Sequence, residues 1–133
     1  MSTINQEFYI FPEEVYRVGN SSSPKMAALR VGEIDVYEMK GVRMVVSNGK
    51  GISVFTLEGL KKEGLTGFAW KFSKNTPVEF GLKLIDDEKP EHYTLAPTKN
   101  MPLDEYKGLL EKMGLKCSKY LKIKKDGTME VAA

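Results

Sequence analysis

Short segments rich in β-branched and aromatic residues recur along the first half of the chain, and each is bounded by Gly, Pro, Asn or Ser. Segments of this length and composition are typical of strands. The pattern therefore predicts a sheet-rich domain. The expected strands are residues 7–11, 13–18, 32–39, 42–47, 51–56 and 67–72.

Two helices are expected to interrupt the strands. The clearer one spans residues 102–113, where apolar side chains recur at helical spacing between a proline at the start and a glycine at the end. A shorter helix is expected at 57–63. Near the C-terminus the turn dipeptide Asp126-Gly127 predicts a closing hairpin within the basic segment 114–133.

Length and composition favour one domain over residues 1–133. The 133-residue chain is 41% hydrophobic, which is enough for a single core, and no repeat or linker divides it. No apolar run approaches the roughly 20 residues that cross a bilayer. The N-terminus lacks the features of an export signal. These observations predict a soluble protein with no membrane partner, and the single cysteine, Cys117, fits the reducing cytoplasm.

The net charge of +2 is concentrated near the C-terminus, because residues 99–133 carry eight lysines against five acidic residues. A lysine-rich run of this kind can follow the phosphate backbone of a nucleic acid. Such a mild excess is more often a solvated face.

Residue type and spacing argue against several common chemistries. One histidine, His92, and one cysteine, Cys117, provide no cluster of zinc ligands. Residues 47–53 hold two glycines and a lysine without the spacing of a phosphate-binding loop. Ser53 with His92 would resemble a hydrolase pair, but there is no nucleophile elbow and no obvious oriented acid. A thiol pair with His92 is also disfavoured, because Cys117 is expected at the surface after a helix stop.

Two polar side chains stand out among expected strands. The planar guanidinium of Arg17 suits a phosphate or a carboxylate, although a salt bridge to Glu13 or Glu14 is the structural alternative. Ser53 alternates with apolar neighbours and therefore faces away from them. Its hydroxyl would either fix a ligand amide or meet a backbone carbonyl.

A third polar place is the segment around His92. If residues 92–96 form a strand, His92 and Thr94 share one face, while Tyr93 and Leu95 share the other. A lone strand histidine is more often a hydrogen-bonded structural residue than a catalyst.

Taken together and in order, these places resemble the small toxins of the type VI secretion exported effector two family, which belong to the ADP-ribosyltransferase-like group. The similarity spans residues 15–113 and leaves the basic C-terminal segment outside. It is carried by Val15-Tyr16-Arg17, Gly51-Ile52-Ser53-Val54-Phe55, Trp70, Pro77, Gly81-Leu82-Lys83-Leu84, His92-Tyr93-Thr94-Leu95-Ala96-Pro97 and Met101.

The resemblance implies an α+β fold with a split, strongly bent β-sheet core, a nucleotide cleft and a few short helices. It implies NAD as the substrate and a toxin that acts in a bacterial cytoplasm, delivered by a type VI system or expressed there, and neutralised by a cognate immunity or antitoxin protein. The catalytic residues it implies are Arg17, Ser53 and His92. The cofactor-binding residues it implies are Tyr16, Arg17, Ile52, Ser53 and Thr94.

The sequence departs from the wider transferase pattern in its carboxylates. That pattern has a glutamate late in the chain, but no strand-borne Gln/Glu-x-Glu motif follows Ser53. Glu79, Glu88 and Glu91 are the glutamates available. Three alternatives therefore stay open: a non-enzymatic interaction module on the same fold, an RNA-binding or RNA-modifying domain that uses the C-terminal lysines, and a phage or toxin–antitoxin protein.

Overall fold

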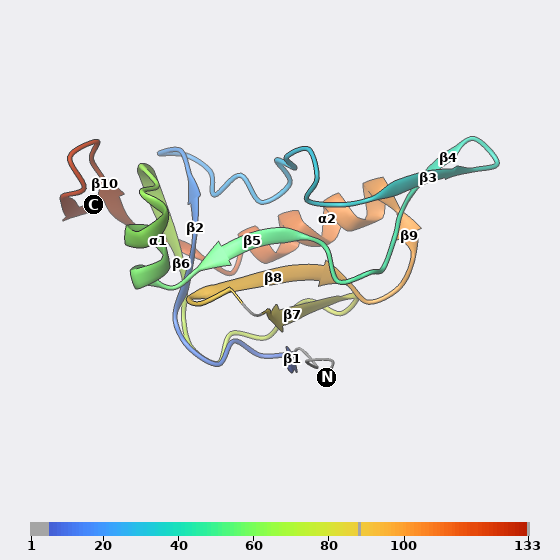
Figure 1. Ribbon diagram of the computed structural model, residues 1–133, viewed down its shortest axis with the longest axis horizontal. Helices are drawn as coiled ribbons and strands as arrows, with labels where there is room; N and C mark the ends of the chain where they lie inside the picture. Colours follow the sequence, from blue (N-terminus) through green and yellow to red (C-terminus); the bar gives the residue numbers. More distant parts are fainter. Residues whose placement is uncertain (1–5, 88, 133) are drawn as a thin grey trace.

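Antiparallel strands and two short helices build the chain, as seen in a computed structural model that describes residues 6–87 and 89–132 (Figure 1). The helices are α1 (Leu57–Glu63) and α2 (Leu103–Gly114). The strands are β1 (Gln6–Phe8), β2 (Val15–Gly19), β3 (Val36–Met39), β4 (Val42–Val45), β5 (Ile52–Phe55), β6 (Gly67–Phe72), β7 (Leu82–Asp86), β8 (His92–Pro97), β9 (Met101–Pro102), β10 (Ser118–Ile123) and β11 (Met129–Val131). This content confirms the expected α+β class.

The main sheet has the strand order β1-β7-β8-β5-β2-β6-β10-β11, and all its pairs are antiparallel. At its centre β2 and β5 pair at one position, where Tyr16 lies opposite Phe55. The neighbouring pairs, β5 with β8 and β2 with β6, are in register along their lengths. The sheet is therefore split into two halves that are joined at one end of the β2–β5 seam.

One face of the sheet forms the main core together with α2. Ile52 and Val54 of β5 lie in this core with Tyr93 and Leu95 of β8, as strand alternation requires. The fully buried Tyr106 of α2 reaches the same place. Its hydroxyl donates to the Leu95 carbonyl at 2.7 Å and accepts from the Ile52 N–H at 3.2 Å. Helix α2 thereby holds the β5–β8 pair from the core side.

Helix α1 covers part of the other face and has clear local end signals. The Thr56 hydroxyl caps its N-terminus by accepting from the Gly59 N–H at 3.2 Å. Gly64 ends the helix in the left-handed conformation, at φ 64°. Leu60 is fully buried in a second apolar cluster with Tyr16 of β2. These signals explain why the prediction for residues 57–63 is confirmed at both ends.

A second, three-stranded sheet has the order β3-β4-β9. Its β3–β4 hairpin extends away from the rest of the molecule (Figure 1). Tyr37 and Met39 of β3 are exposed, whereas Met44 and Val45 of β4 are buried where that strand meets β9.

Most expected elements are present, with shifted ends. The C-terminal hairpin forms around Asp126-Gly127, where Gly127 N–H donates to the Lys124 carbonyl at 2.9 Å. Two strands were not expected, β7 and β9, although both lie in segments that carry the family resemblance. The described residues contain no helix that is both long and apolar enough to span a membrane.

Replacing Tyr106 by Phe should lower the free energy of unfolding by about 1–3 kcal/mol, because the Ile52 N–H and the Leu95 carbonyl would lose a buried partner. Burial raises the pKa of Tyr106, so the hydroxyl stays a donor across the neutral range. Urea unfolding measures the effect. Tyr120→Phe, at a partly exposed ring, is the matched control. Equal stability of the two variants would contradict the role given to the Tyr106 hydroxyl.

Candidate functional site

Four polar side chains, from β5, from β8 and from the residue that follows β7, meet on the face of the sheet opposite α2. Ser53 Oγ lies 2.8 Å from His92 Nε2, and His92 Nδ1 lies 2.7 Å from Asp87 Oδ2. The Thr94 hydroxyl donates to the same carboxylate oxygen at 3.1 Å. The shared face predicted for His92 and Thr94 is confirmed, and Ser53 lies opposite Thr94 in the β5–β8 register. His92 is 8% exposed.

Arg17 occupies the split between β2 and β5. Its guanidinium donates to the Ser53 carbonyl at 3.0 Å, and to the carbonyls of Lys25 and Ala28 at 3.2 and 3.1 Å. The side chain is 7% exposed, and its Nε has no partner among the described residues. Arg17 therefore links the strand of Ser53 to the loop that follows β2.

The salt bridge considered for Arg17 is wrong. Glu14 pairs with Lys71 at 3.5 Å, and Glu13 accepts a hydrogen bond from the Tyr93 hydroxyl. The Arg17 guanidinium donates to three backbone carbonyls instead.

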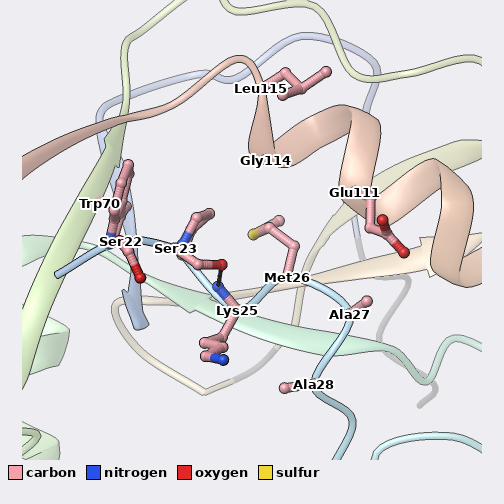
Figure 2. Close-up of a pocket in the computed structure, with 11 residues that line it drawn as sticks. Ser22, Ser23, Lys25, Met26, Ala27, Ala28, Trp70, Glu111, Gly114 and Leu115 are labelled. Atoms are coloured by element: carbon pink, nitrogen blue, oxygen red, sulfur yellow. Dashed lines mark hydrogen bonds between the residues drawn. The ribbon is translucent and has the colours of Figure 1, made fainter. Parts of the chain in front are cut away.

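The loop after β2 is anchored from two sides. Trp70 Nε1 of β6 donates to the Asn20 carbonyl at 2.9 Å, and Lys119 Nζ of β10 donates to the Ser21 carbonyl at 3.0 Å. A cavity of about 600 Å³ lies between this loop, Trp70 and the C-terminal end of α2 (Figure 2). The hydrogen bonds from Trp70 and Lys119, together with those from Arg17 on the inner side, hold residues 20–28 beside the split.

Two further cavities meet at Ser53. One has a volume of about 510 Å³ and reaches Asp87 and Thr94. The other, of about 180 Å³, reaches Arg17. Ser53, Arg30 and Glu33 line both. We call the two together the Ser53 cleft.

The Ser53 cleft is rich in charge. Burial is the main factor that lowers the pKa of the Arg17 guanidinium, and nearby Arg30 acts in the same direction while Glu33 opposes it. Arginine nevertheless stays protonated in proteins. Lys50 and Lys89 also line the cleft, paired with Asp35 at 3.1 Å and with Glu63 at 2.6 Å. No ion pair of Arg30 occurs among the described residues, so its charge is available to an anion.

Two of the expected cofactor-binding side chains lie outside the Ser53 cleft. Tyr16 is adjacent to Arg17 but points to the opposite side of β2, into the cluster under α1. Ile52 is fully buried in the main core. Both follow from strand alternation, because a neighbour of a cleft residue faces away from the cleft. The structure brings together Arg17, Ser53, His92 and Thr94.

The carboxylates of the site are not the glutamates that the sequence offered. Glu79 pairs with Lys116 at 3.2 Å, Glu91 accepts from the Thr56 hydroxyl, and Glu88 lies outside the described residues. Asp87, which sequence reasoning missed, is the acid that contacts His92. Its only signal is the spacing of five positions from His92. The described residues contain no group of His, Cys, Asp and Glu suited to a metal ion.

Cys117 is half-buried rather than at the surface as expected. It packs against the main core, and its thiol donates to the Gly114 carbonyl at 3.2 Å. Burial raises the pKa of this thiol to about 11. The described hydrogen bonds of Cys117 and His92 do not join the two residues.

The split antiparallel sheet and the polar cleft at its seam define a small α+β domain with a charged cleft at its centre. A family model described as Tse2 ADP-ribosyltransferase toxin matches residues 11–120. The chain belongs to this family of toxins, as its resemblance indicated. No curated protein matches the sequence significantly.

Replacing Arg17 by Met should lower the free energy of unfolding by roughly 2–3 kcal/mol, because three carbonyls lose a charged donor. The loop should also loosen, so trypsin should cut native protein faster after Lys25. Urea unfolding and timed proteolysis measure the two effects. Arg43→Met, at an exposed arginine of β4, is the control. Unchanged cleavage and stability would show that Arg17 does not hold the loop.

Cys117 should react slowly with thiol reagents in the native state. A thiol with a pKa of about 11 is almost wholly protonated at pH 8, and only the thiolate attacks. Native protein should therefore react about 200-fold more slowly than protein unfolded in urea, whose free cysteine has a pKa of about 8.5. The native rate should rise about tenfold per pH unit up to the thiol pKa. Equal rates in native and unfolded protein would contradict the burial effect.

Proposed function

We propose that this protein is an NAD-consuming toxin that binds the dinucleotide in the Ser53 cleft and breaks the bond between nicotinamide and ribose. Membership of the Tse2 ADP-ribosyltransferase toxin family supports the reaction class. The observation that carries the proposal is the hydrogen bond between Ser53 Oγ and His92 Nε2, which lies where two cavities meet.

The positive charges of the cleft suit the pyrophosphate of NAD. The exposed guanidinium of Arg30 is placed to contact it directly by charge-assisted hydrogen bonds. Arg17, which the resemblance implies as a cofactor-binding residue, contributes its charge while its terminal nitrogens donate to three carbonyls. Arg17 is thus a positioning residue with respect to Ser53, and Arg30 is the phosphate contact that sequence reasoning missed.

Ser53 and Thr94 line the polar wall against which the nicotinamide ribose would lie, and His92 supports Ser53 from behind by its hydrogen bond. Bond cleavage develops positive charge on the ribose, and fixed dipoles and carboxylates stabilise such charge best in a water-poor site. The Asp87 carboxylate stands behind His92 and lines the larger cavity. It is the acidic group that the site offers in place of the absent glutamate motif.

The biological part of the proposal follows from the family. The protein would act in a bacterial cytoplasm after type VI delivery or local expression, and a cognate immunity or antitoxin protein would neutralise it. NAD depletion or ADP-ribosylation of a cell component would account for growth arrest.

Ser53→Ala and His92→Ala should each reduce nicotinamide release from NAD by about 10²–10³-fold, the usual effect of losing one oriented polar group. Release is followed by chromatography with purified protein, and growth arrest is followed on expression in a susceptible bacterium. Ser118→Ala, at an exposed serine of β10, is the matched control and should keep both activities.

Folding of each variant is checked by its thermal unfolding temperature. If the wild-type protein arrests growth but releases no nicotinamide, the alternative of a non-enzymatic interaction module is correct. If folded Ser53→Ala and His92→Ala remain fully active, the Ser53 cleft is not the site.

A further inference from the structure

Ser53, His92 and Asp87 form a continuous hydrogen-bonded chain. The distances are 2.8 Å from Ser53 Oγ to His92 Nε2 and 2.7 Å from His92 Nδ1 to Asp87 Oδ2. A serine, an imidazole and a carboxylate in this order are the arrangement that activates a serine hydroxyl as a nucleophile. Ser53 comes from β5, whereas Asp87 and His92 lie more than 30 positions later, directly after β7 and at the start of β8.

The Asp87 carboxylate is itself held in place. Its Oδ1 accepts the Lys89 N–H at 3.1 Å, and its Oδ2 accepts the Thr94 hydroxyl at 3.1 Å in addition to the imidazole. Both oxygens thus have partners, and Asp87 directly follows β7. The acid is therefore oriented toward His92 rather than free to turn into solvent.

The His92 ring is also fixed. It is nearly buried, and it packs edge-on against Phe55 with a centroid distance of 5.1 Å. Phe55 and His92 are paired residues in the β5–β8 register. The ring is held between a strand neighbour and two hydrogen bonds, one on each nitrogen.

These contacts determine where the protons lie. An ionised carboxylate only accepts hydrogen bonds, so His92 Nδ1 must carry a proton. In the neutral ring Nε2 is then an acceptor, and the proton between it and Ser53 belongs to the serine hydroxyl. The Ser53 hydroxyl therefore donates to His92 Nε2 and keeps both lone pairs of Oγ free, at a residue that lines the cleft.

We propose that Ser53 Oγ is an activated nucleophile, that His92 is its general base, and that Asp87 is the positioning residue that fixes the proton-accepting tautomer of His92. When Oγ attacks an electrophilic carbon or phosphorus in the cleft, a new bond to oxygen forms and the leaving group departs with its bonding electron pair. The hydroxyl proton passes to Nε2, and the Asp87 carboxylate stabilises the resulting imidazolium.

One consequence rests on the proposed function. If NAD occupies the cleft, the electrophile is the anomeric carbon of the nicotinamide ribose, and the leaving group is neutral nicotinamide. Ser53 then carries ADP-ribose through a new carbon–oxygen bond, and the serine proton is on His92. The triad geometry itself is independent of this substrate.

The tautomer can be read directly, because His92 is the only histidine in the sequence. In nitrogen-15 spectra of the imidazole at neutral pH, Nδ1 should be the protonated nitrogen and Nε2 the unprotonated one. Asp87→Asn should shift the population toward Nε2–H, since the amide can donate to Nδ1. Asp86→Asn, the exposed neighbour at the end of β7, should leave the spectrum unchanged. An imidazolium or an Nε2–H tautomer in the wild-type protein would overturn the proposal.

The nucleophile is tested with a fluorophosphonate ester, which transfers its phosphonyl group to an activated serine with loss of fluoride. Peptide mass spectrometry should find the label on Ser53. Asp87→Asn should slow labelling by about 10²-fold, the usual scale of general-base assistance, and Asp86→Asn should not. No label on wild-type Ser53, or equal rates in Asp87→Asn and the wild type, would refute the activated serine.

The two proposals fail in different ways. Labelling of Ser53 without release of nicotinamide from NAD would remove the proposed function and leave the nucleophile. Nicotinamide release that is unchanged in Asp87→Asn, together with unchanged labelling, would remove the nucleophile and leave the proposed function. A mass increase by one ADP-ribose on Ser53 after incubation with NAD would support both.

Discussion

The buried guanidinium of Arg17 is the interaction on which the cleft depends. Beyond the Tyr16–Phe55 pair, β2 and β5 no longer bond to each other, and the Ser53 carbonyl would lack a partner in the sheet. Arg17 supplies that partner and also holds two carbonyls of the following loop. The sheet can therefore open without leaving these backbone acceptors unsatisfied, and Ser53 lies at the opening, where it lines both cavities of the cleft.

On both sides of the β2–β5 seam, two backbone segments lie too close together for any side chain between them. A Cβ at Gly19 would lie 2.2 Å from the Ser23 carbonyl oxygen, and a Cβ at Gly51 would lie 2.0 Å from the Leu95 oxygen. Only glycine fits where the loop folds back on β2 and where β5 enters its pairing with β8. The loop and the strand thus hold the charged side chain at a fixed distance from Ser53.

The sequence predicted the elements well where the signals are local. Thr56 and Gly64 delimit α1, and the turn dipeptide marks the last hairpin. It did less well where a side chain's role depends on a distant segment. Asp87 follows β7, a strand whose apolar run was not recognised, and its contact with His92 exists only after β7 and β8 pair. Tyr16 and Ile52 were expected to bind the cofactor together with their neighbours Arg17 and Ser53. Strand alternation turns both side chains away from the cleft.

Strand alternation also separates stability from chemistry in this domain. On β5 and β8 the residues that face α2 fill the core, and their backbone bonds are secured by the Tyr106 hydroxyl. The residues between them, Ser53, His92 and Thr94, face the other way and have polar partners. Because the two sets point to opposite faces of the same strands, polar residues can be exchanged on one face while packing on the other face is kept. The same two strands can therefore remain rigid while the chemistry of their open face is altered.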